Sequence, residues 1–240
     1  MGRPTARADP QSFDRFAVDY DRYASLEPPM VLDWLLAQLP SRGRRALDAG
    51  CGSGRHTLAL ADRFDEVVGI DISQPLIDLA HHHRPHPRIR YQVGDLLTIT
   101  DPQGFDLVWS STTLHHLPDL EVALHHLRGL VASGGTAILV DNVAARPTPP
   151  GWVYRLGAIR DLPADLRRHG WRQAWWLLRF RSSPSWLDHL TSDRYLSRQV
   201  FEQRYGAIFP GAQFHALGYA HALVWHNPAE PPDGSATRSY

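Results

Sequence analysis

Short apolar runs alternate along the chain with longer segments in which apolar residues recur every three or four positions. Short runs that end in an acidic or small polar residue are typical of buried strands, and the longer segments are typical of amphipathic helices. The runs predict strands that end at Asp48, Asp71, Gly94, Ser110 and Asn142, and the segments predict helices over Met30–Leu39, from Thr57, over Gln74–His83 and over Leu120–Val131. Strands that alternate with helices in this way predict an α/β fold with a parallel sheet.

Three glycines, Gly50, Gly52 and Gly54, follow the first expected strand. A glycine-rich turn between a strand and a helix lets the backbone approach a ligand closely, because no Cβ intervenes and a positive φ costs little. Asp71 follows after roughly 20 residues, a spacing that suits a carboxylate accepting both ribose hydroxyls of a nucleoside. Asp48 would repel a diphosphate but not a ligand that carries an ammonium group. The turn therefore favours a nucleoside with a cationic part over a dinucleotide.

Five segments, in order, resemble the motifs of the class I S-adenosylmethionine-dependent methyltransferases. They are Leu47–Gly54, Val68–Ser73, Val93–Leu96, Phe105–Leu117 and Leu127–Asp141. The order and spacing of five motifs are more specific than any one of them, and the resemblance extends over Phe13–Pro228. With the strand pattern, it implies a Rossmann-like, seven-stranded, mostly parallel sheet with helices on both faces, an antiparallel last strand and a helical insertion after strand five. The last two strands are expected at Gln213–Leu217 and Ala222–Trp225.

The same resemblance divides the chain into segments. Residues 12–143 are expected to form the S-adenosylmethionine-binding core, 144–192 a helical lid, and 193–228 the completion of the core by a helix and two strands. That helix is expected to start in the segment from Asp193 and to close at Phe209. Residues 1–11 are polar and residues 229–240 are rich in proline, glycine and serine, so both ends are expected to be disordered.

S-adenosylmethionine is the cofactor that the resemblance implies. The cofactor-binding residues it implies are Tyr20, Asp48, Gly50, Cys51, Gly52, Gly54, Asp71, Ile72, Asp95, Leu96 and Ser110. Asp71 is implied to hold the ribose, and Asp95 with the next backbone amide to meet the adenine. Tyr20 lies on the apolar face of a helix expected over Phe13–Tyr23, which either packs on the core or covers the methionine part of the cofactor. Cys51 is expected to be a small, partly buried filler of the turn rather than a nucleophile.

Methyl transfer from a sulfonium needs a nucleophile held in line with the methyl carbon, and a base only where the acceptor's pKa is well above the operating pH. His116 is the first candidate for a catalytic residue and His115 the second, because both follow the fourth strand. The alternative is that they belong to a packing element, with one imidazole bonded to the backbone. Substrate-binding residues are expected at strand ends on the same side of the sheet, at Asp141, Asn142, Tyr219 and His221.

A histidine run, His81–His83, ends the helix that follows the second strand. A helix that starts at the ligand side of a parallel sheet ends on the opposite side, so this run is expected to be a solvated helix end. No metal site is expected.

The segment Ala144–Ser192 is rich in tryptophan and arginine. Seven arginines against two aspartates give Gly151–Arg181 an excess charge of about +5 within a chain of zero formal net charge. The segment is interpreted as a helical lid that shapes the acceptor pocket, as the surface of a homodimer, or as a basic amphipathic surface for anionic lipid. The first two interpretations can hold together.

The composition narrows the partners. The chain of 240 residues has one cysteine, and its zero net charge gives no general affinity for nucleic acid. Residues 110–113 are Ser-Ser-Thr-Thr, where methylases of base amino groups carry an Asn/Asp-Pro-Pro-aromatic element. No apolar run approaches the roughly 20 residues that span a bilayer. These features predict a cytoplasmic protein with no stable membrane association.

The expected activity is methyl transfer to an oxygen, nitrogen or carbon nucleophile of a small molecule in specialised metabolism. A second hypothesis is a protein of the same fold that binds S-adenosylmethionine but catalyses a non-methyl reaction or acts as a scaffold. A third, a nicotinamide-dependent oxidoreductase, is disfavoured by Asp48 and by the glycine spacing.

Overall fold

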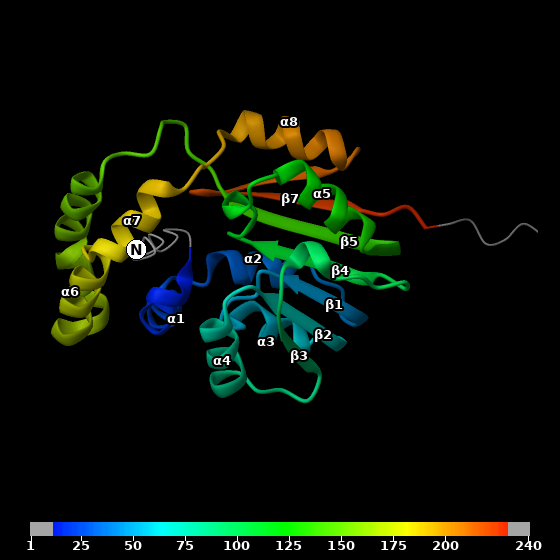
Figure 1. Cartoon of the computed structure of the whole chain (residues 1–240), viewed down its shortest axis with the longest axis horizontal. Helices are drawn as coiled ribbons and strands as arrows, with labels where there is room; N and C mark the ends of the chain where they lie inside the picture. The colour runs from blue at the N-terminus through cyan, green and yellow to red at the C-terminus, as the bar shows by residue number, and fades with distance from the viewer. Residues whose placement is uncertain (1–11, 230–240) are drawn as a thin grey trace, which may run out of the picture.

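The fold, given by a computed structural model that describes residues 12–229, is built on one seven-stranded sheet in the order β3-β2-β1-β4-β5-β7-β6 (Figure 1). The strands are β1 Gly43–Ala49, β2 Phe64–Asp71, β3 Ile89–Val93, β4 Phe105–Ser111, β5 Val131–Asn142, β6 Gln213–Leu217 and β7 Ala220–His226. Strands β1 to β5 pair in parallel, and β7 runs antiparallel to both β5 and β6. The predicted Rossmann-like sheet is therefore confirmed.

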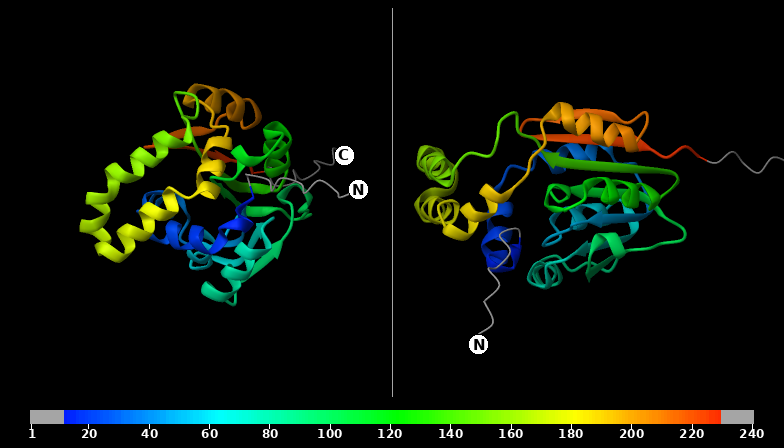
Figure 2. Two further views of the ribbon diagram at one scale, coloured as in Figure 1. Left: turned by 60° about the vertical axis from the view of Figure 1, so that its left-hand side comes forward. Right: turned by 45° about the horizontal axis from the view of Figure 1, so that its top comes forward.

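Helices cover both faces of the sheet (Figure 2). They are α1 Ala17–Leu26, α2 Met30–Gln38, α3 Arg55–Ala61, α4 Gln74–His83, α5 Leu120–Gly129, α6 Gly151–Arg181, α7 Pro184–Ser192 and α8 Arg198–Ile208. Buried residues of α5 and α8, such as Leu124 and Phe201, pack on one face. Buried residues of α2 and α3, such as Leu35 and Leu60, pack on the other. Burying apolar side chains on both faces is what the continuous apolar strands require.

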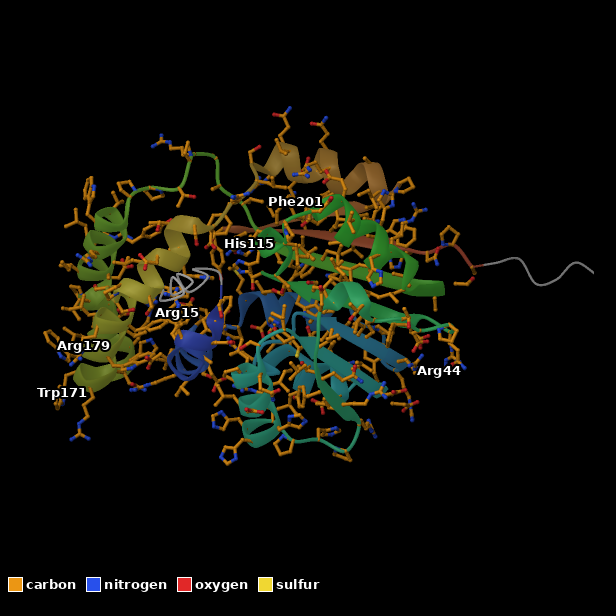
Figure 3. All side chains as sticks on the ribbon, viewed as in Figure 1. Arg15, Arg44, His115, Trp171, Arg179 and Phe201 are labelled. Carbon is orange, nitrogen blue, oxygen red and sulfur yellow. The ribbon has the colours of Figure 1, made fainter. Side chains whose placement is uncertain are left out.

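The insertion after β5 contains α6 and α7, and it lies with α1 beyond the sheet in Figure 1. A buried aromatic cluster of Phe16, which immediately precedes α1, with Phe180 of α6 and Trp186 of α7 joins the N-terminal segment to both helices of the insertion. Figure 3 shows Trp171 and Arg179 at the outer side of α6, away from the strands. Trp171 is 70% exposed, so this side of α6 does not pack against the rest of the protein. Helix α1 and the insertion are together called the cover below.

Several element boundaries differ from the sequence predictions: α1 begins at Ala17 rather than Phe13, α3 at Arg55 rather than Thr57, and β7 at Ala220 rather than Ala222. Helix α5 ends at Gly129, and Val131, which the sequence predicted to end this helix, is instead the first residue of β5. The pairing of β4 with β5 shifts register between Phe105 and Leu107, and this irregularity accommodates residues 132–135 within the strand.

The start of α8 also differs, because it is Arg198 rather than the segment from Asp193. The Ser197 hydroxyl accepts a hydrogen bond from the Val200 amide at 3.3 Å and caps the helix there. Leu196 instead forms a parallel bridge with Val143. Disorder was expected for residues 1–11 and 229–240, and all of these except residue 229 lie outside the described residues.

No helix within residues 12–229 is both long enough and apolar enough to cross a bilayer.

Candidate cofactor and acceptor site

One cavity of about 560 Å³ lies between the ends of the parallel strands and the covering helices α1 and α7. Its walls come from the turn after β1, the end of β2, the segments after β3 and β4, and the helices of the cover. The volume falls within the range of small-molecule and cofactor sites. Ligands of open α/β sheets bind at this same edge, outside the carboxyl ends of the strands.

The glycine turn forms one wall. Gly50 has φ +80°, and a Cβ there would overlap the side chain of Thr113, so the turn closes only with glycine. Gly52 has φ +53° and no atom within 4 Å of the position its Cβ would take. Its amide donates a hydrogen bond of 2.8 Å to Oδ2 of Asp71. The turn and the acid at the end of β2 are thus held together as one surface.

Asp71 is the last residue of β2 and lines the cavity beside the glycine turn. Its second oxygen, Oδ1, accepts a hydrogen bond from the Ser73 amide at 2.9 Å. Burial raises the pKa of the Asp71 carboxyl, although the bonds from the Ser73 and Gly52 amides oppose this. The next residue, Ile72, lines the cavity with a side chain that is 78% exposed. A carboxylate fixed by two amides beside an exposed apolar side chain suits a ribose with a flat base next to it.

The third wall follows β3, where Asp95 and Leu96 line the cavity. Asp95 caps a short 3-10 helix, Leu96–Thr98, by accepting a hydrogen bond from the Leu97 amide at 2.9 Å.

The cover is tied to the turn by a network around Asp21 of α1. This side chain accepts a hydrogen bond of 2.6 Å from the Ser53 hydroxyl and pairs with Arg84 at 2.8 Å and His83 at 3.0 Å. Tyr20, the preceding residue, lines the cavity, and burial raises the pKa of its hydroxyl to about 12. The end of the histidine run therefore meets the N-terminal cover rather than solvent alone.

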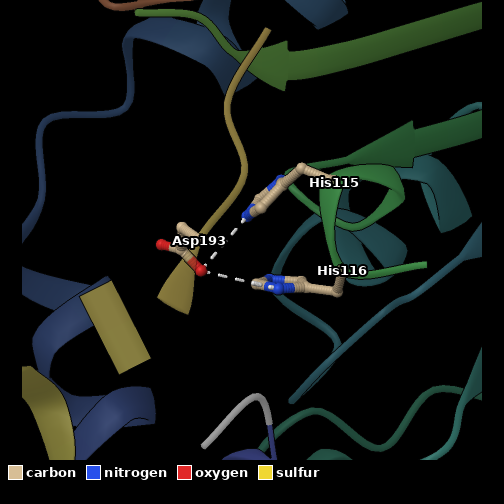
Figure 4. Close-up of side chains that lie close together, drawn as sticks. All are labelled: His115, His116 and Asp193. Carbon is tan, nitrogen blue, oxygen red and sulfur yellow. Dashed lines mark ion pairs between the residues drawn. The ribbon is translucent and has the colours of Figure 1, made fainter. Parts of the chain in front are cut away.

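The far end of the cavity is polar and enclosed. His115 and His116 lie in a 3-10 helix, Leu114–His116, after β4. Asp141 accepts hydrogen bonds from the His115 amide, at 2.9 Å, and from its Nδ1. Asp193, whose side chain is 1% exposed, faces both imidazoles from the end of α7, as Figure 4 shows. Tyr195 donates its hydroxyl to Oδ2 of Asp193.

The pKa values of the two neighbouring imidazoles are shifted in opposite directions. Burial disfavours the protonated form of His115, but the charges of Asp141 and Asp193 outweigh it, so the pKa of His115 is raised. Burial lowers the pKa of His116 to about 2, and His115 and His189 add to this effect.

The comparisons with known proteins bear directly on this cavity. A family described as methyltransferase domain matches residues 47–139, the segment that carries the glycine turn, Asp71 and both histidines. An uncharacterized methyltransferase of Mycobacterium tuberculosis is 30% identical over 200 residues, which are 80% of this chain and 91% of that protein. The chain belongs to the class I S-adenosylmethionine-dependent methyltransferases. S-adenosylmethionine is its cofactor.

Other similarities of this methyltransferase extend over less of the chain or have lower sequence identity. The ubiquinone biosynthesis O-methyltransferase of Coxiella burnetii is 34% identical over 110 residues, 45% of this chain and 47% of that protein. Among solved structures, the complex of DhpI with SAM and HEP gives a TM-score of 0.61 at 19% identity, over 90% of this chain and 94% of that one. At this identity, the likeness shows the fold alone.

Most residues that the sequence analysis selected meet at the cavity of the methyltransferase. Those on its wall are Tyr20, Gly50, Cys51, Gly52, Asp71, Ile72, Asp95, Leu96, His115, His116, Asn142 and Tyr219. They come from segments far apart in the sequence, which the order of the strands brings to one edge of the sheet.

Five selected residues do not line the cavity. Asp48 is buried and accepts a hydrogen bond of 2.6 Å from the Thr57 hydroxyl, and Gly54 packs against Tyr91. The Ser110 hydroxyl donates to the Ala49 carbonyl at 2.7 Å and so ties β4 to β1. Asp141 is hydrogen-bonded to His115, which lines the cavity in its place. His221 is turned to Glu202 of α8, 2.8 Å from Nε2, and burial lowers its pKa.

The sequence analysis did not select three polar residues at the enclosed end: His189, Asp193 and Tyr195. His189 and Asp193 are four residues apart, at the end of a helix. This helical spacing of a histidine and an acid was the one signal that could have found them. Nothing in the sequence places α7 opposite β4, because that contact depends on how the insertion folds back.

Proposed function

We propose that this methyltransferase methylates an oxygen or nitrogen atom of a small molecule bound at the histidine end of the cavity. The observation that carries the proposal is the continuity of one cavity from the glycine turn and Asp71 to His115 and His116. A cofactor at the first end and an acceptor at the second would share one enclosed space. Such proximity can contribute roughly 7–11 kcal/mol to a displacement reaction.

The cofactor end supports the following assignment. Asp71 accepts the ribose hydroxyls, Asp95 and Leu96 border the adenine, and Tyr20 covers the methionine part. Gly52 is assigned to let the cofactor lie against the backbone of the turn, because no atom lies within 4 Å of the position that its Cβ would take. When bound, S-adenosylmethionine would supply a methyl group on a cationic sulfur: the acceptor's lone pair forms the new bond, the carbon–sulfur bond breaks with its electrons going to sulfur, and the acceptor's proton passes to water.

The acceptor end supports an oxygen or nitrogen nucleophile rather than a purely apolar one. His115, His116 and Asn142 supply polar atoms there, and Trp186, Leu190 and Phe13 supply apolar walls. A few polar groups on a mostly apolar cavity wall orient a ligand that itself carries polar atoms. His115 and His116 are therefore assigned to contact the nucleophile, with Asp141 as the residue that positions His115.

The insertion fits the role of a lid at this end. Its helix α7 supplies Trp186, His189 and Leu190 to the cavity wall, while α6 supplies none of the lining residues. Closing the cavity on this side excludes water from the acceptor. The division of the chain into core and lid, the cytoplasmic location and the place in specialised metabolism stay predictions.

The test is a turnover assay that measures S-adenosylhomocysteine with a panel of hydroxylated and amino-bearing aromatic acceptors. We expect product with at least one acceptor, and we expect His116→Ala to lower turnover at least tenfold with little change in S-adenosylmethionine affinity. Calorimetric binding of S-adenosylmethionine with no product from any acceptor would favour the scaffold or non-methyl hypothesis instead. Full turnover in His116→Ala would return this histidine to a packing role.

A further inference from the structure

Three imidazole nitrogens surround one carboxylate oxygen at the enclosed end of the cavity. The distances to Oδ1 of Asp193 are 3.7 Å from His116 Nδ1, 3.9 Å from His189 Nε2 and 4.0 Å from His115 Nε2. These separations exceed those of hydrogen bonds, which lie near 3 Å. The four side chains come from two segments that the fold brings together, the one after β4 and the end of α7.

This spacing is close to that of a metal centre. One ligand atom each from His115, His116 and Asp193 lie within 4.8 Å of one another. Bonds of about 2.0–2.1 Å place neighbouring ligand atoms roughly 3.3 Å apart around a tetrahedral ion. Small rotations of three side chains would therefore close the set around an ion. Figure 4 shows that both imidazoles already point toward the Asp193 carboxylate.

Each end of the set is held by a partner outside it. Nδ1 of His115 is hydrogen-bonded to Asp141, so Nε2 is the ring nitrogen that faces Asp193, 4.0 Å from its Oδ1, and it is the atom that an ion would take. Tyr195 donates to Oδ2 of Asp193, so that Oδ1 is the oxygen turned to the imidazoles. A carboxylate on the far nitrogen of a ligating histidine is the usual outer support of a metal site.

We propose that His115, His116 and Asp193 bind one divalent transition-metal ion, with His189 beside it. Two imidazoles and one carboxylate suit zinc, cobalt, nickel or iron(II) better than magnesium or calcium, which prefer oxygen ligands. Three protein ligands leave coordination positions open, and all three residues line the cavity. An oxygen of the acceptor can take such a position, where the ion would stabilise the charge that develops as the proton leaves. The contact between the ion and the acceptor rests on the proposed function, whereas binding of the ion itself does not.

The test of ion binding uses the full chain, stripped with a chelator and titrated calorimetrically with Co²⁺ and with Zn²⁺. We expect one ion per chain and, for Co²⁺, the visible absorption of a site with nitrogen ligands. His116→Ala and Asp193→Asn should each weaken binding at least about 100-fold, more than loss of an outer partner does. S-adenosylmethionine affinity, measured in the same samples, shows that each variant is folded.

The matched control is His82→Ala, which removes an imidazole from the exposed histidine run of α4, a surface that can bind ions adventitiously. It should leave the affinity unchanged. Loss of binding in His82→Ala, or retention in both His116→Ala and Asp193→Asn, would overturn the site, as would absence of any ion at one equivalent.

The catalytic part is tested by turnover of the stripped protein with and without one equivalent of Co²⁺ or Zn²⁺. Activity that returns with the ion supports an ion that contacts the acceptor, and full activity without it overturns that role while leaving methyl transfer intact. An ion that binds tightly in a protein that methylates no acceptor would mean that the proposed function fails and the ion site stands.

Discussion

Asp71 is the residue on which the cofactor end depends most. Its two oxygens accept amide hydrogen bonds from opposite sides, Gly52 in the turn and Ser73 before α4. Asp71→Ala removes the ribose acceptor and one anchor of the turn, so we expect S-adenosylmethionine affinity to fall at least about 100-fold, from the loss of charge-assisted bonds. Asp71→Asn keeps the shape of the side chain but replaces one hydrogen-bond acceptor with a donor. Its S-adenosylmethionine affinity should lie between those of wild type and Asp71→Ala. Isothermal calorimetry measures both, and equal affinity in all three proteins would remove the assigned role.

Asp48 is a residue whose burial should be visible in stability. Burial raises the pKa of its carboxyl to about 7, with the charge of Asp71 adding to the effect and the Thr57 hydroxyl opposing it. Folding then favours the protonated form, so this group stabilises the fold most below pH 4 and progressively less as the pH rises to 7. Between pH 5 and pH 8 we expect it to lower the free energy of unfolding by about 2–3 kcal/mol.

The measurement compares wild type with Asp48→Asn, without cofactor, by urea unfolding at pH 5, 6, 7 and 8. Asparagine cannot ionise, so the difference between the two proteins should grow in favour of the variant as the pH rises. A constant difference across this range would mean that Asp48 does not titrate there.

Single residues show where sequence reasoning succeeds and where it ends. The glycine turn, Asp71 and the two histidines after β4 could be placed from the sequence, because each is fixed by the strand next to it. Asp141 and His221 could be placed at a strand end, but not the direction of their side chains. Alternation along a strand decides that direction, and β5 begins at Val131, a residue that the sequence analysis had assigned to the preceding helix.

At the scale of elements, the link between α1 and the core is the feature that the sequence did not reveal. Asp21 of α1 is buried, and it meets Arg84 and Ser53, which are far from it in the sequence. Arg84→Met should leave this carboxylate with Ser53 and His83 alone and cost about 3 kcal/mol, the lower end for breaking a buried pair. Hydrogen exchange should become faster in α1 while β1 and β4 stay protected.

The control for this prediction is Arg42→Met, which breaks an ion pair with Asp65 whose side chains are 75% and 48% exposed. Such a surface pair contributes about 1 kcal/mol or less, so exchange in α1 should not change. If Arg84→Met behaves like this control, the network does not hold the cover.

The insertion shows a similar limit at the level of a helix. The segment Ala144–Ser192 was interpreted as helical from the sequence, and its first helix, α6, contains Trp171, Ala174, Trp175 and Leu178 at helical spacing. Gly170 breaks this helix with φ 74° and ψ 170°, a conformation that glycine adopts readily, and the chain then turns back on itself. Periodicity reports which residues share a face but not how two helical segments cross. The position of α7 against His116, and with it the enclosed end of the cavity, therefore came only from the structure.

Over the whole molecule, the cavity joins parts of the chain that otherwise pack separately. Its walls include Tyr20 from the cover, Asp71 and Asn142 from the core, Trp186 from the insertion and Tyr219 from the turn between the last two strands. A ligand that touches all of them binds only the assembled fold, so its binding free energy is added to stability. S-adenosylhomocysteine at 100 times its dissociation constant should add about 2.7 kcal/mol. For a chain of this size that corresponds to a rise in Tm of roughly 5–10 °C.

The distribution of this added stability distinguishes a cover that closes on the ligand from a core that binds alone. If the aromatic cluster of Phe16, Phe180 and Trp186 transmits closure, hydrogen exchange with S-adenosylhomocysteine present should slow in α1 and α7 as well as in the glycine turn. Trp171→Ala, at an exposed position of α6, should leave both the Tm shift and this protection unchanged, whereas Phe16→Ala should reduce protection in α7. Protection confined to the turn and the end of β2 would mean that the cover does not respond to the cofactor, and the acceptor would then have to complete the enclosure itself.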